Sequence, residues 1–181
     1  RPIIYLLFRP RIEGFDNFPA EGATIVYSNH SSNLDPVILG VMLPRRIFFM
    51  AKIELFKNPL FSCILRNLGA FPVKRGKADI SSIKKSLQIL KQDKVLGIFP
   101  EGTRNRSGEI KDFSHGLASI AHKSKASVVP IAIVNGYHIF RPTTIKIGNA
   151  LKYEKYYNER SNNQMLDKMS EDMKIALKLL L

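Results

Sequence analysis

Short apolar segments alternate with helix-like segments along nearly the whole 181-residue chain. Strand-like segments lie at 23–28, 46–51, 70–73, 95–99, 127–134 and 144–147. Helix-like segments lie at 36–43, 59–67, 80–90, 114–124 and 161–181. This alternation indicates an α/β fold, with a mixed, partly parallel sheet flanked by helices. No linker or repeat divides the chain, so we expect one domain over 1–181 with a terminal helix at 161–181.

Pro130 and Cys63 each give a separate structural expectation. Pro130 lies inside the long apolar segment 127–134. Because proline has no amide hydrogen for a sheet ladder, we expect an edge strand or a break there. The single cysteine, Cys63, lies in an apolar run, and we expect a small buried side chain rather than a nucleophile. One cysteine permits neither an intramolecular disulfide nor a cysteine-based metal site, and it favours a reducing compartment.

Charge is the unusual part of the composition. The chain has 28 Lys and Arg against 15 Asp and Glu, a net charge of +13. Residues 1–150 hold 22 of these cations against 10 acids, so the surplus accompanies that part of the chain rather than the terminal helix. Such a surplus indicates an anionic partner: nucleic acid, an acidic membrane surface or a phosphorylated substrate.

The first ten residues hold a short apolar block between basic flanks. A transmembrane helix needs roughly 18 or more apolar residues, and we find no such stretch in the sequence. Segment 1–10 is therefore expected either to lie on a membrane surface or to cover part of the core.

The strongest candidate for chemistry is a histidine directly after the buried strand 23–28. His30 is followed, after four intervening residues, by Asp35 and then Pro36. A short turn would bring the carboxylate to one imidazole nitrogen, fix the tautomer and leave the other nitrogen to accept a proton. The structural alternative is that Asp35 is a helix N-cap before a first-turn proline, and that His30 is an ordinary loop residue.

A second candidate loop follows the strand 95–99. Gly102 would let the backbone approach a ligand, and Thr103 offers a hydroxyl donor. Arg104 can bind a phosphate or carboxylate through two hydrogen bonds, and Glu101 can accept from a substrate hydroxyl or hold an arginine. The alternative is a polar surface turn, since Gly, Asn and Ser are common there.

Two further cations follow predicted strands. Lys52 comes after 46–51, and Arg75 lies in a basic turn after 70–73. Read alone, each is a solvated surface charge. The carboxyl ends of parallel strands share one edge of the sheet, however, and that edge is where α/β proteins place their sites. We therefore expect these cations to join His30 and the 101–104 loop.

Together these segments resemble the glycerolipid acyltransferase family, whose typical member acylates 1-acylglycerol 3-phosphate. NHSSNLD at 29–35 is similar to the family's His-x4-Asp motif, and FPEGTR at 99–104 to its Glu-Gly-Thr-Arg block. Further similarities lie in AKIEL at 51–55, GAFPVKR at 69–75 and VVPIA at 128–132. The motifs occur in the family's order between about residue 13 and residue 134.

The resemblance implies direct acyl transfer from a thioester, acyl-CoA or acyl carrier protein, to the free hydroxyl of lysophosphatidic acid. His30 would be the general base and Asp35 would orient it. Lys52, Arg75 and Arg104 would hold the acceptor's phosphate, with Glu101, Gly102 and Thr103 completing the acceptor site. The resemblance implies no metal and no cofactor. It favours a peripheral protein on the cytoplasmic side of an anionic membrane.

Other functions stay open at this point. Within acyl transfer, the acceptor is alternatively glycerol 3-phosphate or another lysophospholipid. From a different class, the charge fits a basic nucleic-acid-binding module, although the sequence holds no zinc-finger spacing or aromatic RNA-binding motif. A metal-dependent phosphoester hydrolase using His30, Asp35 and Glu101 is a third reading, but such sites generally need more ligands.

Overall fold

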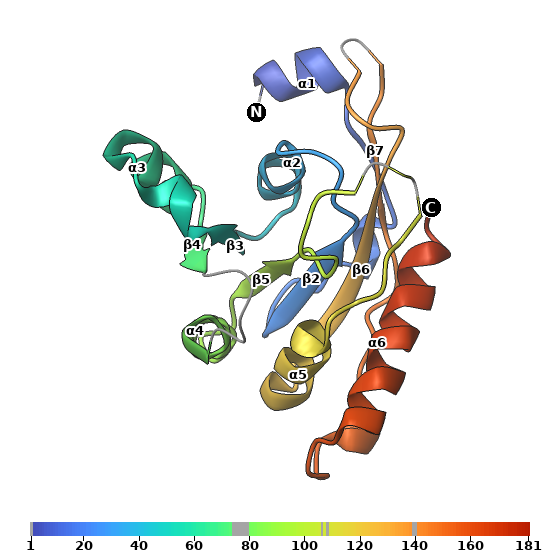
Figure 1. Cartoon of the computed structure of the whole chain (residues 1–181). Coiled ribbons are helices and arrows are strands. Elements are labelled where there is room, and N and C mark those ends of the chain that lie inside the picture. The colour runs from blue at the N-terminus through green and yellow to red at the C-terminus, as the bar shows by residue number, and fades with distance from the viewer. Residues whose placement is uncertain (1, 74–79, 106, 108, 139–140) are drawn as a thin grey trace.

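A seven-stranded sheet covered by helices on both faces forms the molecule (Figure 1). The computed structural model describes all residues except 1, 74–79, 106, 108 and 139–140. The strands are β1 (Arg11–Glu13), β2 (Thr24–Ser28), β3 (Ile47–Lys52), β4 (Ala70–Val73), β5 (Val95–Ile98), β6 (Ser127–Val134) and β7 (Thr144–Ile147). The α-helices are α1 (Pro2–Phe8), α2 (Asp35–Met42), α3 (Pro59–Asn67), α4 (Ile80–Leu90), α5 (His115–Ser124) and α6 (Asn163–Lys178). Short 3-10 helices are η1 (Phe15–Asn17), η2 (Ile53–Phe56) and η3 (Glu154–Tyr156).

The strand order is β1-β7-β6-β2-β5-β3-β4, and β6–β7 is the antiparallel pair in an otherwise parallel sheet over the described residues. Parallel crossovers are right-handed. Connections that run outward to β3 and β4 therefore place α2 and α3 on one face. Those that return to β5 and β6 place α4 and α5 on the other (Figure 1). The predicted α/β fold with a mixed, partly parallel sheet is confirmed.

Both faces of the sheet are buried, which explains why its strands are apolar throughout rather than alternating. All five residues of β2 are buried. Ile25 and Tyr27 pack toward α4, α5 and α6, while Val26 packs toward α2. The Tyr27 hydroxyl donates to the Met173 carbonyl at 2.8 Å and so attaches the terminal helix to the central strand.

Pro130 corrects one prediction, because β6 is an interior strand between β7 and β2. The ladder with β7 begins one residue later, at Ile131 opposite Ile147. The Pro130 carbonyl accepts from the Gly148 amide at 2.9 Å, so its missing amide hydrogen faces the same side, beyond the end of β7. The proline therefore removes only a hydrogen bond that lies beyond the end of β7.

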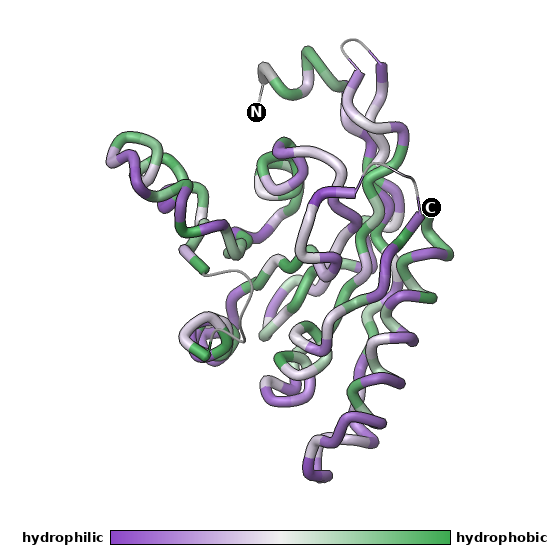
Figure 2. Tube along the Cα trace, in the orientation of Figure 1, coloured by the Kyte–Doolittle hydropathy of each residue, from purple (hydrophilic) through white to green (hydrophobic). Residues whose placement is uncertain are grey.

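Cys63 corrects another prediction, because it is exposed on α3. Over its whole length α3 buries no residue. The apolar run around Cys63 therefore lies at the surface. Figure 2 shows that α3 carries several apolar residues.

The amino-terminal segment covers part of the core, as one of the two expectations for 1–10 has it, and the expected membrane contact stays a prediction. Residues 2–8 form α1, in which Ile4 and Phe8 pack against the core. Tyr5 and Leu6 of the same helix are exposed. Within the described part of the chain, no helix combines the length and apolar character needed to span a membrane.

Gly97 in β5 gives a test of the packing beneath the site. A methyl group there would overlap the ring of buried Phe49 and come within 2.9 Å of Ile47 Cγ2. We expect Gly97→Ala to lower the free energy of unfolding by about 1–3 kcal/mol in urea titrations. Gly40 in α2 has open space around it, so Gly40→Ala is the control and should stabilise by about 0.5–1 kcal/mol. Equal effects of the two substitutions would contradict this account.

Candidate active site

The loop that leaves the carboxyl end of β2 returns to form a His–Asp pair. His30 Nδ1 lies 2.7 Å from Asp35 Oδ2. The Asp35 side chain is fully buried and the His30 side chain is 11% exposed. Among the described residues, none bonds His30 Nε2, so this nitrogen is left to act on a ligand. The predicted hydrogen bond between the two residues is present.

The Asp35 carboxylate is held by four donors. Its Oδ2 accepts from His30 Nδ1 and from the Ser31 and Ser32 amides, the latter two at 2.8 Å each. Its Oδ1 accepts from the Tyr137 hydroxyl at 2.7 Å. A buried carboxylate needs such donors in place of water. The N-cap reading of Asp35 is wrong, because α2 begins at Asp35 itself and its carboxylate turns back onto the preceding loop.

Tyr137 is a site residue that sequence reasoning missed. It lies in the loop after β6, 102 positions beyond Asp35, and no motif links the two. Burial, then the negative charge of Asp35, then the hydrogen bond to Asp35 raise the pKa of Tyr137 far above its ordinary value. Tyr137 therefore remains protonated and continues to donate to Asp35 at any physiological pH.

The imidazole of His30 lies flat against an aromatic ring. Its centroid is 4.1 Å from that of Phe99, with 20° between the planes. Phe99 is in turn stacked on Phe49, which crosses β5 above Gly97. The stack and the bond to Asp35 together set both the plane and the rotation of the His30 ring.

Asn29 anchors the same loop to the neighbouring strand β6. Its side-chain amide donates to the Ile133 carbonyl at 2.9 Å, and its carbonyl accepts from the Ile133 amide at 2.8 Å. This pair of bonds continues the sheet pattern with a side chain after β2 has ended. The backbone at His30 is therefore held from the β6 side as well.

The loop after β5 is attached to His30 through Asn105. The Asn105 amide donates to the His30 carbonyl at 2.7 Å, and its side chain donates to Glu101 Oε2 at 2.8 Å. Glu101 thus stabilises the loop through Asn105. Gly102 has φ +68° and open space beside its Cα, while Thr103 and Arg104 are exposed. The structure brings this loop to the His–Asp pair, as expected from the adjacency of β2 and β5.

Only one of the two other predicted cations lies within the described residues. Lys52 ends β3 on the same edge of the sheet, where its Nζ lies 3.5 Å from Glu54 Oε1. Arg75 lies outside the described residues. Their assignment to phosphate binding therefore stays a prediction.

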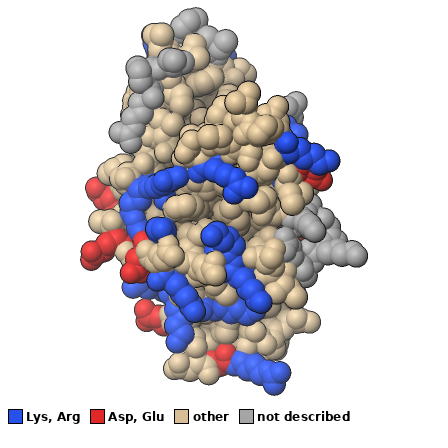
Figure 3. All heavy atoms as spheres, turned by 90° about the vertical axis from the view of Figure 1, so that its left-hand side faces the viewer, with Lys and Arg blue, Asp and Glu red and all other residues tan. Residues whose placement is uncertain are grey.

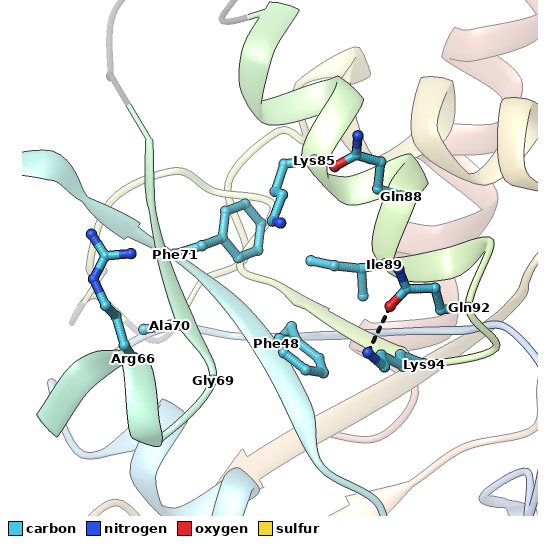
Figure 4. Close-up of a pocket in the computed structure, with 10 residues that line it drawn as sticks. All are labelled: Phe48, Arg66, Gly69, Ala70, Phe71, Lys85, Gln88, Ile89, Gln92 and Lys94. Carbon is cyan, nitrogen blue, oxygen red and sulfur yellow. Dashed lines mark hydrogen bonds between the residues drawn. The ribbon is translucent and has the colours of Figure 1, made fainter. Parts of the chain in front are cut away.

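The described residues include a pocket away from the His–Asp pair but no group of side chains that would hold a metal ion. In the described ranges, no three His, Cys, Asp or Glu side chains gather as a metal site would require. A pocket of about 260 Å³ lies between β4 and α4, lined by Phe48, Arg66, Phe71, Lys85 and Lys94 among others (Figure 4). Gly69 and Lys94 precede their strands, so this pocket is at the amino edge of the sheet, opposite His30.

Comparison with known proteins agrees with this geometry. The sequence pattern of the family described as Acyltransferase matches residues 9–134, more than half of the chain. The chain belongs to the acyltransferase family. It is 37% identical to the 1-acyl-sn-glycerol-3-phosphate acyltransferase of Bacillus subtilis over 73% of this chain and 67% of that protein. It is 32% identical to the chloroplastic enzyme LPAT1 of Arabidopsis thaliana over 72% of this chain but 37% of that protein.

A solved structure extends the similarity to the fold. The crystal structure of the 1-acyl-sn-glycerophosphate (LPA) acyltransferase PlsC from Thermotoga maritima superimposes with a TM-score of 0.69 at 28% identity. The superposition covers 94% of this chain and 71% of that one. Family membership favours acyl transfer over the nucleic-acid-binding alternative.

Tyr137 supplies a test of how the pair is held. Tyr137→Phe removes the hydroxyl bonded to Asp35 Oδ1, and a bond to a charged acceptor is worth about 1.5–3 kcal/mol. We expect kcat for acyl transfer to fall about tenfold or more, with little change in the KM for the acceptor. The control is Tyr27→Phe, which loses a buried hydrogen bond to α6 on the other face of the sheet. An unchanged kcat in Tyr137→Phe, or an equal loss in both variants, would contradict the positioning role.

Proposed function

We propose that this protein transfers a fatty acyl group from a thioester donor to the free hydroxyl of lysophosphatidic acid, producing phosphatidic acid. The observation that carries the proposal is the 2.7 Å bond between His30 Nδ1 and the buried Asp35, with Nε2 left for the substrate. The names of the bacterial and chloroplastic relatives support this acceptor. The proposal treats residues 1–181 as one acyltransferase domain.

His30 acts as the general base. Its Nε2 takes the proton of the acceptor hydroxyl as the oxygen attacks the thioester carbonyl, forming a tetrahedral oxyanion. When the oxyanion collapses, the carbon–sulfur bond breaks and the imidazolium returns the proton to the departing thiolate. The products are the ester and the free thiol. Asp35 keeps Nδ1 protonated and stabilises the imidazolium. Because the acceptor hydroxyl is itself the nucleophile, no nucleophile from the protein is required.

The acceptor's phosphate is the ligand proposed for the cations that follow the strands. Arg104 is exposed in the loop that is bonded to His30 through Asn105, which supports its assignment as a phosphate ligand. Lys52 and Arg75 are the further phosphate ligands of this proposal. The open space at Gly102 and the hydroxyl of Thr103 complete the acceptor site, and Glu101 keeps its loop in place through Asn105.

The substrates also define where the protein works. Lysophosphatidic acid is a membrane lipid, and the donor is acyl-CoA or acyl carrier protein. A peripheral position on the cytoplasmic side of an anionic membrane suits both the substrates and the charge of +13. The exposed Tyr5 and Leu6 of α1 provide one contact with that surface.

The first test is removal of the base. We expect His30→Ala to lower kcat by 10²- to 10⁴-fold, because general-base catalysis contributes about this factor. Three of the four donors to Asp35 remain, so the circular dichroism spectrum should be unchanged. The assay uses a panel of lysophosphatidic acid, glycerol 3-phosphate and other lysophospholipids with both donors. Full activity in His30→Ala refutes the mechanism, and a preference for another acceptor corrects the substrate.

The second test concerns the phosphate. We expect Arg104→Ala to raise the KM for lysophosphatidic acid about tenfold, since a charge-assisted hydrogen bond is worth about 1.5–3 kcal/mol. Arg160→Ala, which removes an equal charge from an exposed position elsewhere, is the control and should leave the KM unchanged. If both variants behave alike, Arg104 contributes general charge and does not bind the phosphate.

A further inference from the structure

The segment 53–68 presents large apolar side chains to solvent. Leu60 is 78% exposed and Ile64 is 54% exposed. We call the exposed apolar surface of this segment the η2–α3 face; its members are Ile53, Leu55, Leu60, Phe61, Ile64 and Leu68. Within the described residues nothing covers it. A group of neighbouring apolar side chains of this size at a surface generally marks an interaction site.

Helix α3 is capped at its first turn and carries its apolar side chains on the side that faces solvent. Asn58 caps its first turn by accepting from the Phe61 amide at 3.1 Å, and Pro59 begins it. Leu60, Ile64 and Leu68 recur at four-residue spacing and form one stripe. The helix packs against η2 and β4 without burying a residue. Its outer stripe therefore does not contribute to the core of the domain.

Cations surround the apolar stripe. Lys57 and Arg66 are exposed on the segment 53–68, whereas Glu54 is its one acid. Lys85 and Lys94 line the pocket that Arg66 also lines, where α3 ends at the amino edge of the sheet (Figure 4). Figure 3 views this side directly and shows Lys and Arg side chains spread across it, with Asp and Glu mostly at its margin. Apolar side chains within a basic surround are typical of proteins that lie on anionic membranes.

The η2–α3 face also begins near the reacting groups. η2 follows the carboxyl end of β3, and His30 follows the carboxyl end of β2, so both leave the same edge of the sheet. α1, whose Tyr5 and Leu6 are exposed, and α3 are both drawn in the upper part of Figure 1, around α2. A membrane that touched both helices would present its lipids toward the edge that carries the His–Asp pair.

We propose that the η2–α3 face inserts its apolar stripe into the interfacial layer of a membrane that contains anionic phospholipids, with Lys57 and Arg66 contacting the headgroups. The inference rests on the proposed function, because a lipid acceptor requires the enzyme to meet a membrane. Charge argues against a second copy of the chain as the occupant, since pairing two such faces would bring like charges together. An anionic bilayer complements both parts of the surface.

The decisive experiment measures sedimentation with vesicles. We expect Leu60→Ser/Ile64→Ser to weaken binding of the purified protein to vesicles of equal phosphatidylglycerol and phosphatidylcholine by at least tenfold. The matched control is Ile175→Ser/Leu179→Ser, which replaces one exposed apolar residue in α6 and one directly after it and should bind as the unmodified protein does. Unchanged binding by Leu60→Ser/Ile64→Ser overturns the proposal. So does a loss of self-association with vesicle binding retained, which would assign the face to a second copy.

A second pair of double variants tests whether the cations of the η2–α3 face contact the lipid headgroups. We expect Lys57→Gln/Arg66→Gln to weaken binding to phosphatidylglycerol vesicles several-fold and to reduce its dependence on salt, while weak binding to pure phosphatidylcholine stays the same. Lys168→Gln/Lys178→Gln makes the same change of charge on exposed positions of α6 and should have little effect. Equal losses in the two double variants would overturn the assignment of headgroup contacts to this face.

A soluble substrate separates this proposal from the proposed function. Short-chain lysophosphatidic acid below its micellar concentration needs no membrane. We expect Leu60→Ser/Ile64→Ser to acylate it normally while losing activity on acceptor embedded in vesicles. If the unmodified protein binds vesicles through this face but acylates neither form of the lipid, the proposed function fails and the membrane surface stands. If acylation of vesicle-bound lipid is unaffected in the variant, the η2–α3 face is not required and the proposal fails.

Discussion

The buried carboxylate of Asp35 is the constraint on which the site depends. A fully buried charge has no water to solvate it, so it is stable only where protein donors converge on it. Those donors come from the loop after β2 and from Tyr137 after β6. Satisfying this single group therefore fixes the loop path, the His30 tautomer and the position of a distant loop at once.

The sheet explains why these segments meet. β2 lies between β5 and β6, and the connections that follow β2 and β5 leave toward opposite faces. Open α/β sheets bind their ligands at the carboxyl ends of strands whose connections diverge in this way. The loop after β5 contacts His30 twice, because Asn105 bonds to its carbonyl and Phe99 stacks on its ring. On the β6 side, Asn29 next to His30 bonds to Ile133. The base is thus supported on elements that are themselves part of the core.

The same network reaches the surface through α1. Phe8 packs edge-on against Tyr137, with ring centroids 5.7 Å apart, and Tyr137 bonds to Asp35. The helix that exposes Tyr5 and Leu6 therefore lies two side chains away from the carboxylate. With the η2–α3 face, it would place the reacting groups close to the lipid from which the acceptor comes. In this arrangement the surplus of cations would contact lipid headgroups at a defined surface, in addition to attracting the protein to anionic membranes in general.

Although it did not predict the short elements α1 and β1, the sequence by itself determined the order of the other strands and α-helices and the bond between His30 and Asp35. Both follow from local information: the apolar periodicity of each segment, and two residues five positions apart in one turn. Only the tertiary structure decided that Tyr137 completes the pair, that Pro130 lies in an interior strand, and that Cys63 is exposed with the apolar stripe of α3. These outcomes depend on which distant segments pack together and which surfaces remain uncovered. An apolar pattern shows that a side chain avoids water, but it does not distinguish the protein core from a membrane.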